Sequence, residues 1–282
     1  MFAPILRFEE GQAGVVPSPL PRSWGAVELE FLNKRGRTCA HRVFQAGVMR
    51  ARFPNVAVEM PPEAVLINTA GGLTGGDCMT VGIEMGAGTR ATVTTQAHEK
   101  IYRACAGEVS VISNMRVGPG GSLEWLPQPT ILFDKARLAR ETHVALSETS
   151  MFLGVEAVIF GRTAMGEAIT SGALSDSWTI RRGGRLIHAD RFMLGGDIAA
   201  ALAQPLVLAG NAAMATIRLV AEDAAAKLEA VRASIADCGA ASAWNGMLLA
   251  RIVTKDGYQL GMALTRALTA LRGRPLPPVW RI

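Results

Sequence analysis

Apolar and polar residues alternate over much of the chain, which is the pattern of a β-strand with one buried face. After Asp77, for example, Met79, Val81 and Ile83 alternate with polar or small residues. Comparable short stretches end at Gly, Pro, Asn or Asp, and they include 26–32, 38–45, 57–60, 108–112, 138–146 and 152–160. We therefore expect a succession of strands from Trp24 to about Val220.

Strands that follow one another without intervening helices predict a β-sandwich, a barrel or a body of stacked strands resembling a β-solenoid. No strict repeat period is visible, which disfavours a regular solenoid. Thirty glycines in 282 residues favour many turns over many helices. The length allows one large domain or two smaller units.

Two amphipathic helices are predicted near the C-terminus. The first spans 223–237, with apolar residues three and four positions apart and Gly239 as its C-cap; the second spans 259–272 and ends at Gly273. One further strand, 244–253, is expected between them. At the other end, residues 1–22 contain four prolines and predict a loose arm.

Composition limits the classes of function. With 49% hydrophobic and 19% charged residues the chain is globular, and no segment is an unbroken membrane span or a signal peptide. The net charge of +5 is not gathered into a long basic run, which disfavours nucleic acid. The four cysteines form no CxxC pair. We expect a soluble, reduced protein of the cytoplasm.

Four glycines punctuate one short loop: Gly71, Gly72, Gly75 and Gly76. The spacing GGxxGGD differs from phosphate-binding loops, and a strand rather than a helix is predicted to follow it. The loop is therefore either a tight turn in a β-protein or a place where another backbone approaches closely.

With the residues that follow it, this loop resembles the signature of the urease accessory protein UreD family, called UreH in some bacteria. The resemblance continues through Lys100, Tyr102 and Arg103, and then through nearly the whole chain. The other matching segments are LEWLPQPTILFD at 123–134, Gly161-Arg162, Met165-Gly166-Glu167, Trp178, Arg191 and PPVW at 277–280. It implies a single domain over 1–282, built as a β-solenoid-like body with two C-terminal helices.

Three carboxylates lie in apolar surroundings: Asp77, Glu156 and Asp190. A carboxylate in such a position must be paired, hydrated or coordinated. From the residues alone, Asp77 is a turn cap, Glu156 faces solvent on an edge strand, and Asp190 pairs with an arginine. The resemblance implies instead that the three positions offer Ni²⁺ a series of transient sites.

The resemblance implies a urease maturation chaperone that is not an enzyme and holds no permanent cofactor. Its implied partners are apo-urease, UreF, and UreG through UreF, with Ni²⁺ in transit to urease. Two alternatives remain: a scaffold that holds urease open without touching metal, and a hydrolase using Asp77 and Cys78. The histidines show no HxH or HxxxH spacing, which fits loose transit sites and equally fits no metal role.

Overall fold

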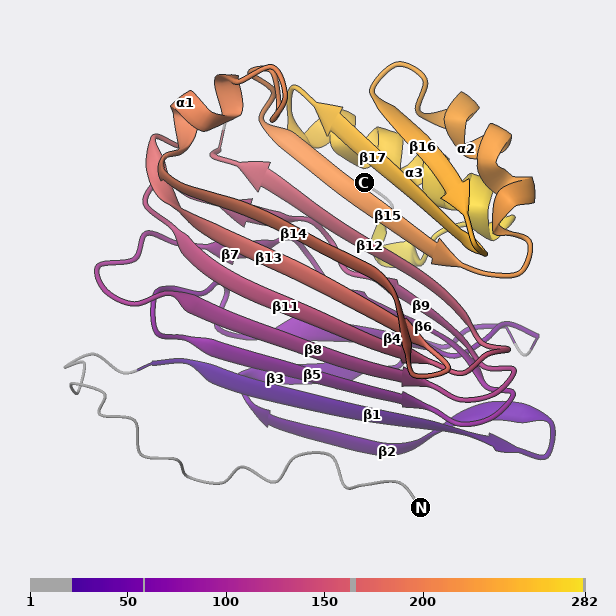
Figure 1. The fold of residues 1–282 in the computed structure, drawn as a ribbon. Helices are drawn as coiled ribbons and strands as arrows, with labels where there is room; N and C mark the ends of the chain where they lie inside the picture. Colours follow the sequence, from indigo (N-terminus) through magenta and orange to yellow (C-terminus); the bar gives the residue numbers. More distant parts are fainter. Residues whose placement is uncertain (1–21, 58, 163–165, 281–282) are drawn as a thin grey trace.

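The computed structural model describes residues 22–57, 59–162 and 166–280. The predicted arm at 1–22 therefore lies outside the described residues, except for Arg22, and so does Met165 of the family motif. In the described part of the chain, most strands belong to two sheets that pack face to face (Figure 1). This confirms the expected β-solenoid-like fold class with helices near the C-terminus.

One sheet has seven strands, in the order β14-β13-β11-β8-β5-β1-β2. They are β1 Trp24–Lys34, β2 Arg37–Gly47, β5 Cys78–Met85, β8 Val109–Val117, β11 Arg137–Leu146, β13 Ser171–Arg182 and β14 Arg185–Asp197.

The other sheet has ten strands, eight of which follow the order β16-β17-β15-β12-β9-β6-β4-β3. They are β3 Met49–Arg52, β4 Glu63–Asn68, β6 Arg90–Thr95, β9 Ser122–Leu126, β12 Met151–Phe160, β15 Ala213–Val220, β16 Gly239–Trp244 and β17 Met247–Thr254. The short strands β7 Glu99–Ile101 and β10 Thr130–Leu132 pair with each other, and β10 also pairs with β12.

The chain passes back and forth between the sheets, so that successive strands of one sheet run parallel. β5, β8, β11 and β13 are parallel neighbours in the first sheet, while β4, β6, β9 and β12 are parallel neighbours in the second. β12 is buried on both of its faces. Its even-numbered residues face the first sheet and its odd-numbered residues face the helices, as the two separate apolar cores show.

The helical segments are α1 Ile198–Ala203, η2 Ala224–Lys227, α2 Leu228–Ser234, α3 Gly257–Arg272 and η3 Pro278–Trp280. α2 and α3 form a third layer beside β15, β16 and β17 (Figure 1). α3 confirms the predicted second helix, with Asp256 as N-cap and Gly273 as the left-handed C-cap. The predicted first helix is divided into η2 and α2.

Two local expectations were wrong, and one strand begins later than expected. Residues 57, 59 and 60 are not in a strand, since the Met60 N–H donates to the Ala57 carbonyl in a turn. Pro61 and Pro62 follow directly and have no N–H to give to a ladder. The predicted strand 244–253 is present as β17, which begins at Met247, after a turn at Asn245 and Gly246 that joins it to β16. Finally, α1 interrupts the strands, capped by Asp197, whose carboxylate accepts the Ala200 N–H.

The last described residues cover the outer face of the second sheet. The buried Trp280 indole donates to Thr94 Oγ1 at 3.1 Å and to the Leu126 carbonyl at 3.3 Å. Nearby, Glu124 accepts from Arg272 and Arg274, each at 2.9 Å. The C-terminal segment is therefore bound to strands formed from the first half of the chain.

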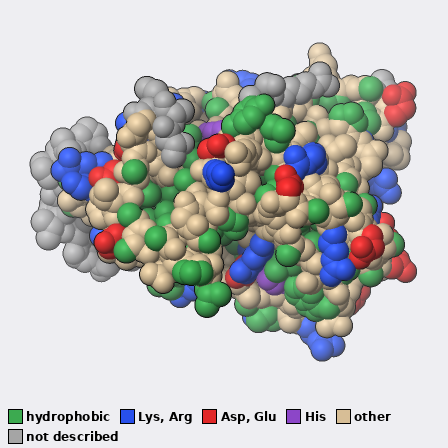
Figure 2. Space-filling model, turned by 90° about the horizontal axis from the view of Figure 1, so that it is seen from above, with side chains coloured by type: hydrophobic (Ala, Val, Ile, Leu, Met, Phe, Trp, Pro, Cys, Tyr) green, Lys and Arg blue, Asp and Glu red, His purple; other side chains and the backbone are tan. Residues whose placement is uncertain are grey.

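Charged side chains are dispersed over the surface shown in Figure 2. On this face, Lys and Arg side chains are interspersed with acidic and hydrophobic ones and do not gather into one continuous basic area. A protein that binds nucleic acid commonly presents such an area. The distribution on this face agrees with the dispersed charge of the sequence.

Candidate functional site

The glycine loop and the KxYR segment bind each other. Leu73 N–H donates to the Lys100 carbonyl at 2.8 Å, and Tyr102 N–H donates to the Leu73 carbonyl at 2.7 Å. The Tyr102 hydroxyl reaches the Gly71 carbonyl at 3.2 Å. Gly72 must be glycine here, because a Cβ at its φ of +152° would lie 2.3 Å from the Tyr102 ring. Residues 71–73 and 100–102 are thus hydrogen-bonded to each other, and we call these two segments the clasp.

Motif residues from the segments 123–134 and 161–167 gather beside the clasp. The Phe133 ring packs edge-on against Tyr102, at 4.9 Å between centroids, and Arg162 lies over the same ring. Arg162 also forms an ion pair with Glu167. Asp134 Oδ1 accepts the Thr170 and Ser171 N–H groups, and the first of these bonds lowers the pKa of Asp134 to about 2, against burial. These parts of the family signature are therefore brought together by direct contacts in the structure.

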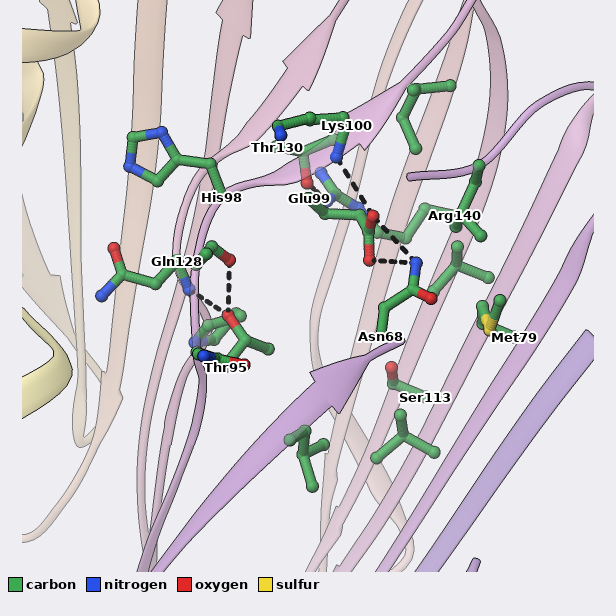
Figure 3. Close-up of a pocket in the computed structure, with 18 of the residues that line it drawn as sticks. Asn68, Met79, Thr95, His98, Glu99, Lys100, Ser113, Gln128, Thr130 and Arg140 are labelled. Carbon is green, nitrogen blue, oxygen red and sulfur yellow. Dashed lines mark hydrogen bonds between the residues drawn. The ribbon is translucent and has the colours of Figure 1, made fainter. Parts of the chain in front are cut away.

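A first cavity, of about 210 Å³, lies between the sheets next to the clasp. Its lining combines apolar residues of both sheets with polar groups. Among the polar groups are His98, Glu99 and Lys100, with Asn68 Nδ2 donating to both Glu99 oxygens at 3.1 Å (Figure 3). Burial raises the pKa of Glu99 and lowers that of His98. Thr130, Arg140 and Glu156 also line it, and Thr130 lies opposite Glu99 in the pairing of β10 with β7.

A second, smaller cavity of about 50 Å³ also touches Glu156. Its other charged lining residues are Asp176, Asp190, Arg191, Arg218 and Arg251. The structure therefore brings two of the three sequence-predicted carboxylates, Glu156 and Asp190, to one cavity. Glu156 is the residue that the linings of the two cavities share.

The carboxylates of this region are joined by arginines across the interior. Arg140 contacts Glu156 at 2.6 Å and Asp176 at 2.7 Å. Arg218 and Arg251 both contact Asp190 at 2.9 Å. Arg218 is 4% exposed and stacks on the Trp178 ring, while Arg251 is 57% exposed. Two ion-paired groups thus lie in this region: Arg140 with Glu156 and Asp176, and Asp190 with the buried Arg218 and the exposed Arg251.

Ionisation of these acids is set by burial and by their arginines. Burial raises the pKa of Glu156, and the Arg140 guanidinium that contacts it opposes the shift. Burial also acts to raise the pKa of Asp190, but Arg218 and Arg251 outweigh it and leave the pKa lowered. Two buried donors beside the second cavity, Arg218 Nη1 and Trp178 Nε1, have no acceptor among the described residues. Buried donors of this kind are commonly satisfied by water.

Asp77 lies apart from this group. Its Oδ1 accepts the Ser23 N–H and its Oδ2 accepts the Thr74 N–H, both at 2.8 Å, and it lines neither cavity. This placement favours the turn-stabilising role that the sequence left as the alternative. It also leaves Asp77 poorly placed to act as a general base beside the exposed Cys78, because both of its oxygens are engaged.

Sequence analysis missed Glu99, Arg140, Asp176 and Arg218. A signal for Arg140 was present, since it occupies an inward position in the alternation Leu138, Thr142, Val144 and Leu146. Among the described residues, no group of three or more His, Cys, Asp and Glu side chains is arranged to hold a metal ion. No helix in that part of the chain is long and apolar enough to cross a membrane.

The imidazole of His188 gives a pH-dependent prediction. Its Nε2 accepts from Arg218 Nε at 3.2 Å, so the ring is neutral, and burial and Arg218 lower its pKa from 6.5 to about 4 although Asp190 opposes them. Between these values the unfolded chain binds more protons, and stability falls as the pH falls from about 6.5 to 4. The ring is partly exposed, so screening limits the loss to roughly 1 kcal/mol.

In His188→Gln, where the amide oxygen still accepts from Arg218, we expect a shallower decline of unfolding free energy over this pH range. Urea unfolding at several pH values measures it. Identical slopes for parent and variant would contradict the assignment.

The fold and interior define a class of protein before any comparison: a two-sheet β-body with two interior cavities that share Glu156 in their linings and have ion-paired carboxylates beside them. The chain belongs to the UreD family, since the model of the UreD urease accessory protein family matches residues 23–281.

Relatives bearing the name urease accessory protein UreD agree. The protein of Rhizobium leguminosarum bv. trifolii is 47% identical over 249 residues, covering 88% of this chain and 91% of that protein. The Agrobacterium fabrum protein is 44% identical over 248 residues, covering 88% and 87%. The Brucella suis protein is 42% identical over 269 residues, covering 94% and 96%. Membership of this accessory-protein family implies a role in urease maturation.

Proposed function

We propose that this protein is a maturation chaperone that binds apo-urease and UreF, with UreG joining through UreF, and passes Ni²⁺ through its interior to urease. No permanent cofactor is involved, since Ni²⁺ is cargo in transit. The proposal places the protein in the cytoplasm with its partners. Family membership supports the maturation role, and the interior supports the transport step.

The observation that carries the transport step is that Glu156 lines both cavities. Carboxylates then follow one another through the interior: Glu99 in the first cavity, Glu156 at the boundary, and Asp176 and Asp190 in the second. Oxygen ligands hold Ni²⁺ more loosely than imidazole or thiolate. A path for an ion needs several such sites, favourable enough to enter and weak enough to leave.

The cavities have room for a partly hydrated ion. One water molecule occupies about 10–15 Å³ of cavity volume. The first cavity, at about 210 Å³, therefore has room for several waters, and the second, at about 50 Å³, has room for a few. Two N–H donors beside the second cavity, Arg218 Nη1 and Trp178 Nε1, have no acceptor among the described residues. They can therefore donate hydrogen bonds to water.

A scaffold that holds urease open without touching nickel is the second candidate. The observation in its favour is that Glu156, Asp176 and Asp190 are all bound by arginine. A buried carboxylate neutralised in this way is a common structural element. The two functions differ in what happens when a carboxylate loses its charge while the assembly stays intact.

Glu156→Gln separates the two functions. Glutamine keeps an acceptor for Arg140 but removes the charge at the point shared by the two cavities. Under the transport function we expect normal assembly with urease and UreF, and a severalfold lower nickel content of urease at limiting nickel. Metal analysis of the purified urease, alongside the yield of the assembled complex, measures both quantities.

Asp77→Asn is the matched control, because Asp77 lines neither cavity. The new amide places a donor against either the Ser23 or the Thr74 N–H, which costs about 1–3 kcal/mol of stability. Per assembled complex, however, urease should receive its normal nickel. Normal nickel content with Glu156→Gln would favour the scaffold, and reduced content with Asp77→Asn alone would return Asp77 to the path.

A further inference from the structure

The Arg140 guanidinium lies at the boundary between the two cavities. Arg140 lines the first cavity, Asp176 lines the second, and Glu156 lines both. The Arg140 side chain is 8% exposed and projects from the inward face of β11 in the first sheet, whereas Glu156 comes from β12 in the second. An ion that passes from one cavity to the other meets this group.

Four contacts hold the guanidinium in place. Nη1 lies 2.6 Å from Glu156 Oε1 and donates to Thr130 Oγ1 at 3.0 Å. Nη2 and Nε donate to the two oxygens of Asp176 at 2.7 and 3.3 Å. Two donors on one carboxylate give the fork geometry in which arginine binds most specifically. Arg140 therefore occupies oxygens on which a metal ion would otherwise bind.

Charge around the boundary is balanced. The three acids Glu156, Asp176 and Asp190 are matched by three arginines: Arg140 contacts Glu156 and Asp176, and Arg218 and Arg251 contact Asp190, at 2.6–2.9 Å. A divalent cation added to this network encounters no net negative charge. It gains carboxylate ligands only where a guanidinium moves away, because two cations cannot share the same oxygens without strong repulsion at low dielectric.

We infer that Arg140 is a gate between the cavities, and that a divalent cation passes by exchanging with its guanidinium on Glu156 and Asp176. This inference rests on the proposed transport function and adds its control point. The flexible arginine stem and the adjoining first cavity give the displaced guanidinium space to move. The gate keeps the path closed until a cation is delivered at high local concentration.

The test uses Ni²⁺ alone, with the full chain purified by itself or with co-expressed accessory proteins. In Arg140→Gln the two carboxylates lose their guanidinium, and we expect the affinity for Ni²⁺, measured by calorimetry, to rise about tenfold or more, equivalent to about 1.4 kcal/mol. The gain should vanish in Arg140→Gln/Glu156→Gln. An affinity of Arg140→Gln within about twofold of the parent would overturn the gate.

Two further variants keep the test decisive. Arg140→Lys retains a positive charge but cannot bind both acids in fork geometry, so it should fold even if Arg140→Gln does not, with a smaller gain in affinity. An Arg140→Lys affinity equal to that of the parent would then overturn the gate. Arg42→Gln is the control, because Arg42 forms an exposed pair with Glu28 at 3.3 Å; its affinity should equal that of the parent.

These measurements distinguish this inference from the transport function. If Glu156→Gln leaves urease nickel content normal while Arg140→Gln still gains affinity, the transport function fails and the competition between guanidinium and metal stands. If Glu156→Gln lowers nickel content while Arg140→Gln gains nothing, the path stands and Arg140 is an ordinary ion-pair partner.

Discussion

Trp280→Ala is expected to lower the free energy of unfolding by about 3–5 kcal/mol, the range for truncating a large buried aromatic. The indole is 5% exposed, belongs to the core beneath α3, and donates to both Thr94 Oγ1 and the Leu126 carbonyl. Truncation opens a cavity and removes the partner of these acceptors. Urea unfolding followed by circular dichroism measures the change.

Loss of Trp280 should also loosen one wall of the first cavity. Gln128, which lines that cavity, donates from Nε2 to the Val279 carbonyl next to Trp280.

Tyr258→Ala is the control, since this aromatic residue of α3 is 69% exposed and its loss should change stability by less than about 0.5 kcal/mol. A loss below about 1 kcal/mol for Trp280→Ala would show that η3 contributes little to the fold.

Gly75→Ala is expected to cost about 3 kcal/mol, at the upper end for overpacking. A Cβ at this position would lie 2.2 Å from the Ala106 carbonyl oxygen and 3.0 Å from that of Gly107. Both atoms belong to the backbone, so no side-chain rotation relieves the clash. The segment beside the glycine loop has to move, and chemical denaturation of the variant measures the cost.

Gly71→Asn is the companion variant. Gly71 has φ +75°, and a Cβ at this position would meet no atom of the described residues within 4 Å, so its requirement is conformational rather than steric. Asparagine tolerates the left-handed region better than most residues, and the variant should lose less than about 1 kcal/mol. Equal losses for the two variants would contradict the view that glycine serves a different purpose at each position.

The alternation of apolar residues predicted the strand-rich body because each strand has a buried face. Residues 79, 81 and 83 are buried in β5 as expected, and the leucine spacing predicted α3. The misassigned segment 57–60 shows the limit of this approach, since β-forming residues alone do not make a strand when prolines follow. In α1, the cap Asp197 and two inward residues, Ile198 and Leu202, determine a helix too short to show periodicity.

The candidate site was less accessible to sequence analysis. Glu156 and Asp190 stood out as acids in apolar surroundings, and the structure places both at the second cavity. Their partners Arg140 and Arg218 come from strands that meet them only in the folded structure, and no sequence spacing encodes that contact. Asp77 stood out for the same reason as the other two, yet its oxygens are bound by backbone N–H groups from Ser23 and Thr74.

The position of Trp280 has a consequence for synthesis. The tryptophan and its acceptor at Leu126 are separated by 154 residues. At about 5–20 residues per second, the ribosome completes β9, which ends at Leu126, roughly 8 to 30 seconds before it adds Trp280, which covers the outer face of that strand. During that interval the nascent chain carries an uncovered apolar sheet face, and a chaperone that binds such faces has time to act on it.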